Sequence, residues 1–164
     1  MKKFSYKLLL AGIFFMAATD DSIAQNKDAA TNKRMIEERN FVFVAQQASS
    51  SRGRSVPLSG GYDLTISGDS MVAYLPFYGR AYTAPIGDDG GIKFTSTSFK
   101  YAVTEKKNRW EINITPSDAD GVQQMYLDVS ASGYANLRVT NINRSPMTFT
   151  GYIVEGKAKE KKAF

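Results

Sequence analysis

The residues of this chain that are best suited to binding another molecule stand in one short run of the sequence. Arg80 is surrounded there by aromatic residues, and Pro76 and Gly79 constrain the backbone between them. A planar guanidinium beside aromatic faces can recognise an anionic or carbohydrate-like ligand. We expect such a ligand-binding site to consist of Arg80, Tyr78, Phe77, Tyr82 and Tyr74. The alternative is that the aromatic side chains fill the core and Arg80 pairs with a carboxylate.

Other kinds of site are poorly supported by the composition. The chain has no cysteine and no histidine, which excludes disulfides, thiol catalysis and catalytic triads that contain histidine. The segment 118–121 resembles the start of an EF-hand loop, but Val129 stands where a bidentate glutamate is needed. Asp88 and Asp89 offer too few oxygens for calcium. We therefore expect no metal and no cofactor.

Paired carboxylates of a glycosidase are the remaining enzymatic option. The carboxylates associated with predicted strands are Asp63, Glu105, Glu111 and Asp128. Most occupy the polar phase of their strands and should face water, as should the lysines Lys93 and Lys100. The sequence therefore predicts a protein that is not an enzyme.

The elements that would position these residues are mostly short strands. Apolar and polar residues alternate in most of these segments, which is typical of half-buried strands, and Gly, Ser, Asn and Asp stand in several of the connections. The predicted strands are 41–45, 62–66, 71–75, 92–95, 99–103, 110–114, 125–130, 135–139 and 147–154. Residues 49–54 are expected to form a flexible connection. Polar residues from Asn26 to about Arg39, with charge pairs at helical spacing, predict one amphipathic helix.

The spacing of the strands indicates the fold class. The connections leave little room for crossover helices, so neighbouring strands should be antiparallel. We expect a mainly β fold, an antiparallel meander that forms a strongly curved sheet or a lipocalin-like barrel, with one N-terminal α-helix. A β-sandwich is the alternative, because periodicity does not distinguish the two.

The N-terminus has the pattern of a secretory signal. Lys2, Lys3 and Lys7 precede an apolar run of about a dozen residues, and small residues stand before a cleavage site after Ala24. We predict a signal peptide at 1–24, a single β-rich domain at 25–156 and a basic, disordered tail at 157–164. The mature chain should have no transmembrane segment and should be periplasmic or secreted.

Charge argues against a nucleic-acid partner. The formal net charge is +5, but the excess of basic residues lies in the signal and the tail rather than on one element with interleaved aromatics. We therefore expect no nucleic acid.

Several segments resemble a known family. They are 62–66 with Gly68 and Asp69, the run 75–82, 132–135, and Asn143 and Arg144 with 151–153. Together they resemble a Bacteroidetes family of exported domains of unknown function, the one numbered 4251, over about residues 41–154. The resemblance implies an exported domain and no assigned activity. Members often look like lipoproteins, and this chain lacks the cysteine that would carry the lipid.

Two functions from different classes follow. The first is a non-catalytic binding module that holds a small molecule or lipid, with an apolar or anionic ligand near Arg80. The second is a structural or interaction component of the cell envelope with a protein partner. A binding module should have a cavity of several hundred Å³ near Arg80, whereas an interaction protein should have a filled interior and an exposed apolar patch.

Overall fold

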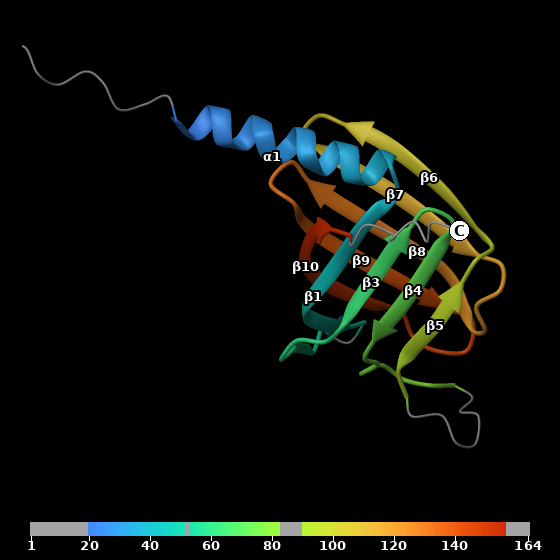
Figure 1. Ribbon diagram of the computed structural model, residues 1–164. Coiled ribbons are helices and arrows are strands. Elements are labelled where there is room, and N and C mark those ends of the chain that lie inside the picture. The colour runs from blue at the N-terminus through green and yellow to red at the C-terminus, as the bar shows by residue number, and fades with distance from the viewer. Residues whose placement is uncertain (1–19, 52, 83–89, 157–164) are drawn as a thin grey trace, which may run out of the picture.

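The computed structural model describes residues 20–51, 53–82 and 90–156, with side chains from residue 28 onward. One helix and ten strands follow one another along the chain (Figure 1). Their bounds are α1 Asp20–Glu37, β1 Asn40–Ser50, β2 Ser55–Pro57, β3 Asp63–Ser67, β4 Ser70–Leu75, β5 Ile92–Ser96, β6 Phe99–Lys106, β7 Arg109–Pro116, β8 Val122–Ser130, β9 Tyr134–Asn141 and β10 Met147–Glu155.

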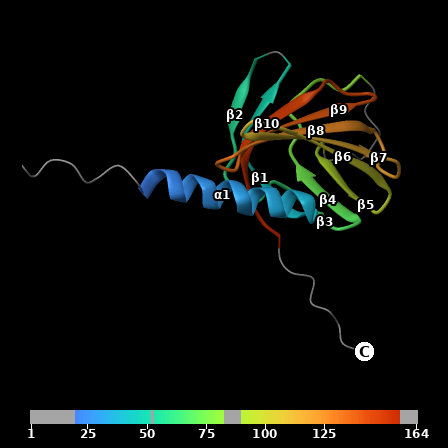
Figure 2. The same cartoon turned by 90° about the horizontal axis from the view of Figure 1, so that it is seen from above.

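The strands form one antiparallel sheet in the order β5-β4-β3-β1-β10-β9-β8-β7-β6, with β2 paired to β1. Two meanders, β3 to β5 and β6 to β10, lie on either side of β1, which pairs with β3 and β10. The sheet curls strongly into a half-barrel (Figures 1 and 2). The curved-sheet prediction is therefore confirmed over the β-sandwich alternative.

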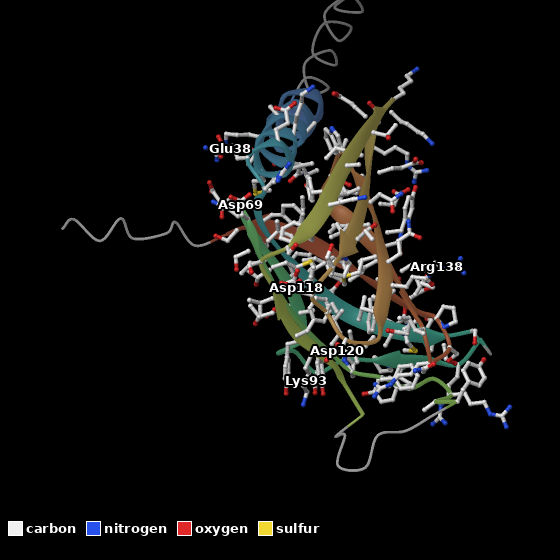
Figure 3. The ribbon with its side chains drawn as sticks, turned by 90° about the vertical axis from the view of Figure 1, so that its right-hand side faces the viewer. Glu38, Asp69, Lys93, Asp118, Asp120 and Arg138 are labelled. Carbon is white, nitrogen blue, oxygen red and sulfur yellow. The ribbon has the colours of Figure 1, made fainter. Side chains whose placement is uncertain are left out.

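The inside of the curl is packed with apolar side chains. Strands such as β7 and β9 alternate buried and outward-facing residues, as half-buried strands should. The largest side chains that are fully buried are Phe41, Phe43, Phe149, Ile36, Leu64, Ile66, Met71, Leu75, Ile112, Ile114, Met125 and Leu127. The two sides of the curl face each other across this core, and Lys93 and Arg138 project outward from opposite sides (Figure 3).

The C-terminal half of α1 packs against one end of the curl. Met35 and Ile36 are buried, and the Tyr101 hydroxyl donates a hydrogen bond to the Ile36 carbonyl over 3.0 Å. Lys33 pairs with Glu105 on β6. The N-terminal part of α1 extends beyond the sheet (Figure 2). The helix is therefore held at its C-terminal half, beside the start of β1.

A bulge bends β1 where it meets β10. The register shifts between Ala45 and Gln47, which leaves Gln46 as the extra residue and turns it outward. Gly151 lies opposite Ala45, and a Cβ atom on it would collide with the backbone carbonyl of Val44. The close approach of the two strands therefore requires glycine at this position.

The nine strands expected from the sequence are present, and two local predictions were wrong. The connection at 49–54 was expected to be flexible throughout, but β1 continues to Ser50 and β2 follows from Ser55, because the Ser50 amide bonds the Arg54 carbonyl and β2 pairs with β1. The helix also begins earlier than expected, at Asp20, and ends at Glu37.

The predicted division of the chain falls partly outside these residues. Most of the predicted signal peptide and the whole predicted tail, 1–19 and 157–164, lie outside the described residues. Within the described parts of the chain, no helix has the length and apolar character needed to cross a membrane.

Candidate functional site

The run that contains Arg80 is tied by its backbone to the connection between β9 and β10. The Arg80 amide donates to Ser145 Oγ over 2.9 Å, and the Ser145 amide donates to the Arg80 carbonyl over 2.9 Å. The Tyr82 amide bonds the Asn143 carbonyl in the same way. The run therefore joins the end of β4 to the far meander, and the Arg80 side chain is exposed.

The aromatic residues near Arg80 point in different directions. Phe77 is half-buried against the core, and the guanidinium over its ring, at 5.2 Å, belongs to Arg144. Tyr74 lies on the outer face of β4, where it stacks on Tyr62 with ring centroids 5.7 Å apart. Lys93 Nζ lies 5.0 Å from the centre of the Tyr74 ring.

The structure therefore does not gather the five expected site residues into one pocket. Tyr78 and Tyr82 are exposed, Phe77 faces inward, and Tyr74 belongs to a separate outer cluster. Their role in binding stays a prediction.

An open groove of about 480 Å³ lies elsewhere, between α1 and the neighbouring strands. The residues that line it are Asp28, Thr31, Asn32, Gln46, Ser132, Gly133, Tyr134, Tyr152 and Ile153. They come from α1, the β1 bulge, the turn between β8 and β9 with the first residue of β9, and β10. The groove is thus assembled from four separate segments of the chain.

One hydrogen bond fixes the helix side of the groove to the sheet side. Asn32 is buried, and its Nδ2 donates to the Ala131 carbonyl over 2.9 Å. Gly133 adopts a φ of 84°, which favours glycine, and a Cβ atom on it would lie 3.3 Å from Asn32 Nδ2. The tight turn between β8 and β9 therefore lets the helix approach closely.

Two tyrosines form the floor on the sheet side. Tyr134 and Tyr152 are directly paired across β9 and β10, on the outer face of the sheet. Tyr134 is 67% exposed. Gln46 lies beside this floor, because the bulge turns it outward near Val44, the residue of β1 that is paired with Tyr152. The sheet side of the groove thus combines two tyrosine rings with the amide of Gln46.

The lining indicates the chemistry of a ligand. Its polar groups are the carboxylate of Asp28, the amides of Asn32 and Gln46, and hydroxyls of serine, threonine and tyrosine, with no lysine or arginine among the lining residues. Amides and hydroxyls both donate and accept hydrogen bonds. The groove is therefore suited to a polar ligand that is neutral or positively charged, rather than to an anion.

Three of the four carboxylates considered for hydrolysis are in ion pairs. Glu105 pairs with Lys33 at 2.7 Å, Glu111 with Lys106 at 2.5 Å and Asp128 with Arg109 at 3.1 Å. The hydrogen bond from Lys106 is the main reason that the pKa of Glu111 is lowered. Partial burial raises the pKa of Asp63. None of the four lines the groove.

The acidic loop at 118–121 has a structural contact of its own. Asp118 accepts a hydrogen bond from Ser96 Oγ and further bonds from the amides of Thr97, at 2.9 Å, and Ser98, at 3.2 Å. These bonds, that from Ser96 first, lower the pKa of Asp118. Among the described residues, no three Asp, Glu, His or Cys side chains are placed to hold a metal ion.

Sequence reasoning missed the residues of the groove. A signal was present in Tyr134 and Tyr152, which stand in the outward phase of their strands where polar residues are expected. Their pairing, and the approach of α1, depend on which strands are neighbours, and strand order is not encoded in the period-two pattern.

Comparison with known proteins connects this fold to a family. The model of a family described as "Domain of unknown function (DUF4251)" matches residues 24–153. A crystal structure of a DUF4251 family protein from Bacteroides eggerthii is similar, with a TM-score of 0.61 and 15% sequence identity, over 81% of this chain and 91% of that one. The search of curated proteins found no match. Since the family model spans most of the half-barrel and part of α1, the chain belongs to the DUF4251 family.

Proposed function

We propose that this protein is a non-catalytic binding module that holds a small polar ligand in the groove between α1 and the sheet. The observation that carries the proposal is the groove itself, about 480 Å³ in volume and lined by two tyrosines, two amides and several hydroxyls. This volume is within the usual range of small-molecule sites.

The position and lining of the groove change the class of ligand that we expect. A lipid held in a barrel needs an interior cavity, and the described interior is packed with apolar side chains such as Phe41, Phe43 and Phe149. An anion would need a cationic partner, and the groove lining contains none. A neutral polar ligand therefore fits the groove better than the apolar or anionic ligand predicted near Arg80.

Native mass spectrometry of the mature protein, purified from the envelope of the cells that express it, tests this proposal. Thr31→Trp should fill the groove from α1. Ala30→Trp is the matched control, because Ala30 is the neighbouring exposed residue of α1 and is outside the groove lining. Wild type and Ala30→Trp should carry the same small-molecule adduct, and Thr31→Trp should lack it. Bare protein in all three, or an adduct that Thr31→Trp retains, would overturn the proposal.

We also propose that the protein is exported and that it works in the periplasm or outside the cell. The N-terminal pattern of lysines, apolar residues and small residues before Gln25 supports this. The intact mass of the protein recovered from the periplasmic and extracellular fractions should correspond to a chain that begins at Gln25. Uncleaved protein confined to the cytoplasm would contradict it.

A second candidate function is protein interaction at the other end of the curl. Tyr82 and Ile142 are 69% and 66% exposed, and their segments are joined by the bond from the Tyr82 amide to the Asn143 carbonyl. Exposed apolar residues of this kind can mark a partner surface. Crosslinking in the envelope should join wild type, but not a Tyr82→Ser, Ile142→Ser double variant, to one specific protein. Equal crosslinking of both would exclude this surface.

A further inference from the structure

Outward-facing side chains continue from the groove in a single row across the sheet. The strand pairing places Tyr134 opposite Tyr152, Tyr152 opposite Val44, Val44 opposite Asp63, Asp63 opposite Tyr74, and Tyr74 opposite Lys93. We name these six residues the outer row. It crosses β9, β10, β1, β3, β4 and β5, and its first two members line the groove.

The outer row has aromatic side chains at two places. Tyr134 and Tyr152 form the first pair. Tyr74 forms the second with Tyr62, whose ring lies nearly parallel to it at an angle of 11°. The Tyr62 carbonyl accepts a hydrogen bond from the Ala45 amide, so Tyr62 lies beside β1, on the side of Tyr74 that is nearer the groove. The second pair therefore lies on the same face of the sheet as the groove tyrosines, further along the outer row.

The row is long enough for a chain of several sugar rings. Neighbouring strands are about 4.8 Å apart, so the four steps from β9 to β4 span roughly 19 Å along the outside of the curl. A ligand that follows the row crosses the strands instead of running beside one. The backbones of β10, β1, β3 and β4 are paired on both sides along this row, so they have few groups left to bind a peptide as an added strand.

The chemistry of the row matches a neutral sugar chain. Flat aromatic faces pack against the apolar faces of sugar rings, while amides and carboxylates bond the hydroxyls. At the second pair, Tyr62 stacks on the Tyr74 ring and Lys93 Nζ lies 5.0 Å from its centre, so a sugar there would contact the exposed rim of the stacked pair. Asp63, which is half-buried, stands between Val44 and Tyr74 and can accept such bonds. Resting on the proposed function of the groove, we infer that the ligand is a neutral oligosaccharide that begins in the groove and extends along the outer row to Tyr62 and Tyr74.

Titration followed by the amide signals of the full mature chain tests this inference. The probes are cellotetraose and maltotetraose, which differ in linkage, each with its disaccharide. At least one tetrasaccharide should shift the signals of residues 131–134 and also those of residues 62 and 74. Its affinity should exceed that of its disaccharide by roughly tenfold, because the longer chain reaches the second aromatic pair.

Two tyrosine variants on the outer face of the sheet separate the row from general surface effects. Tyr74 is in the outer row, whereas Tyr126 lies on β8 opposite Asn113 and Arg138, outside the row and the groove. Tyr74→Ala should weaken the binding of the tetrasaccharide by about fivefold to tenfold and leave that of the disaccharide unchanged. Tyr126→Ala should change the binding of neither sugar, and both variants should keep the wild-type spectrum elsewhere.

The outcomes distinguish this inference from the proposed function. If a tetrasaccharide binds no more tightly than its disaccharide, or Tyr74→Ala has no effect while Thr31→Trp abolishes binding, the extended row is overturned and the groove stands. If no probe shifts the groove signals although a small molecule of another class copurifies with the protein, the carbohydrate assignment is overturned. If Thr31→Trp binds as wild type does, both fail.

Discussion

Arg80 is held in the fold by hydrogen bonds of its backbone, and its side chain takes no part in them. Its amide and carbonyl both bond Ser145, which is buried, while its guanidinium is exposed. We expect Arg80→Ala to change the free energy of unfolding by less than about 0.5 kcal/mol. Ser145→Ala should cost about 1–2 kcal/mol, because it removes the acceptor of the Arg80 amide. Chemical denaturation measures both.

Arg80→Ala also tests the binding site predicted from the sequence. If the ligand occupies the groove, Arg80→Ala should keep the adduct seen by native mass spectrometry. Loss of the adduct from a folded Arg80→Ala variant would favour the site around Arg80 and count against the groove.

Asp118 connects a corner of the sheet to the loop before β8. β5 and β6 are consecutive, yet they are not paired with each other, and the residues between them bond the Asp118 carboxylate. These bonds favour the charged form, so the pKa of Asp118 is lower in the folded protein than in the unfolded chain. Its contribution to stability is therefore present above the unfolded pKa, about 3.9, and is lost as the pH falls through the folded pKa.

Asp118→Asn should make the protein less sensitive to acid. The melting temperature of wild type should fall more steeply than that of the variant between about pH 5 and pH 2, since the variant has no carboxylate to protonate at this corner. Asp120→Asn is the control, because Asp120 is in the same loop while the bonds from residues 96–98 go to Asp118. Parallel curves for wild type and Asp118→Asn would contradict the role of these bonds.

Tyr101 should make the stability of the fold decrease as the pH rises into the alkaline range. Burial raises its pKa above the ordinary value of 10.0, and its hydroxyl donates to the Ile36 carbonyl at the end of α1. A raised folded pKa means that this stabilisation is present below the unfolded pKa and is lost as the pH rises through the folded pKa. Wild type should therefore lose stability above about pH 10, and Tyr101→Phe should lose less.

Thermal melts between about pH 8 and pH 11 check this prediction. Tyr101→Phe should also cost about 1 kcal/mol at neutral pH, because the Ile36 carbonyl loses its donor. Tyr134→Phe, at an exposed position, should change the free energy of unfolding at neutral pH by less than about 0.5 kcal/mol. Identical alkaline slopes for wild type and Tyr101→Phe would show that the hydroxyl does not hold α1.

At the scale of elements, the sequence was most informative about strands and least about their ends. Alternation from Trp110 to Ile114 or from Ala135 to Val139 predicts a strand because each apolar residue must be buried on one face. The short strand β2 has no such pattern, and it exists because β1 offers it a partner. The end of α1 was placed two residues too late, because Arg39 adopts a φ of 52°, a left-handed conformation that follows the helix end and is more usual for glycine.

The contact between β1 and β10 depends on a single glycine. Gly151→Ala would place a methyl group against the Val44 carbonyl, which belongs to the backbone and has no rotamer to change. We expect a loss of about 3 kcal/mol or more in the free energy of unfolding, because the central strands must separate. Thr150→Ala is the matched control, since the neighbouring exposed side chain bonds only the Asn136 side chain in the described contacts. It should cost less than about 1 kcal/mol by urea denaturation.

At the scale of the whole molecule, the curved antiparallel sheet was predictable and the strand order was not. Short connections require neighbouring strands to be antiparallel, whereas the pairing of β1 with β10 joins residues that are 97 to 114 positions apart in the sequence. The groove and the outer row exist only because of this pairing. For the same reason the sequence pointed to the continuous run around Arg80, where the site residues are adjacent in sequence.

The central place of β1 should make the half-barrel unfold as one unit. Phe43 on β1 is fully buried and lies opposite Ile153 on one side and Leu64 on the other. Trp110, the single tryptophan, is buried in the meander β6 to β10, and its fluorescence reports on that half. Circular dichroism reports on all strands, so both signals should change at the same denaturant concentration if the halves are coupled.

Phe43→Ala should lower the free energy of unfolding by about 3–5 kcal/mol, the usual cost of removing a buried phenylalanine. Both signals should report the same decrease. Val72 is 41% exposed on the outside of β4, so Val72→Ala should change the free energy of unfolding by no more than about 0.5 kcal/mol with either signal. A Phe43→Ala variant whose tryptophan signal keeps the wild-type midpoint while the circular dichroism splits into two steps would show that β3 to β5 can unfold alone. β1 would then be a junction between two independent meanders instead of the strand that unites them.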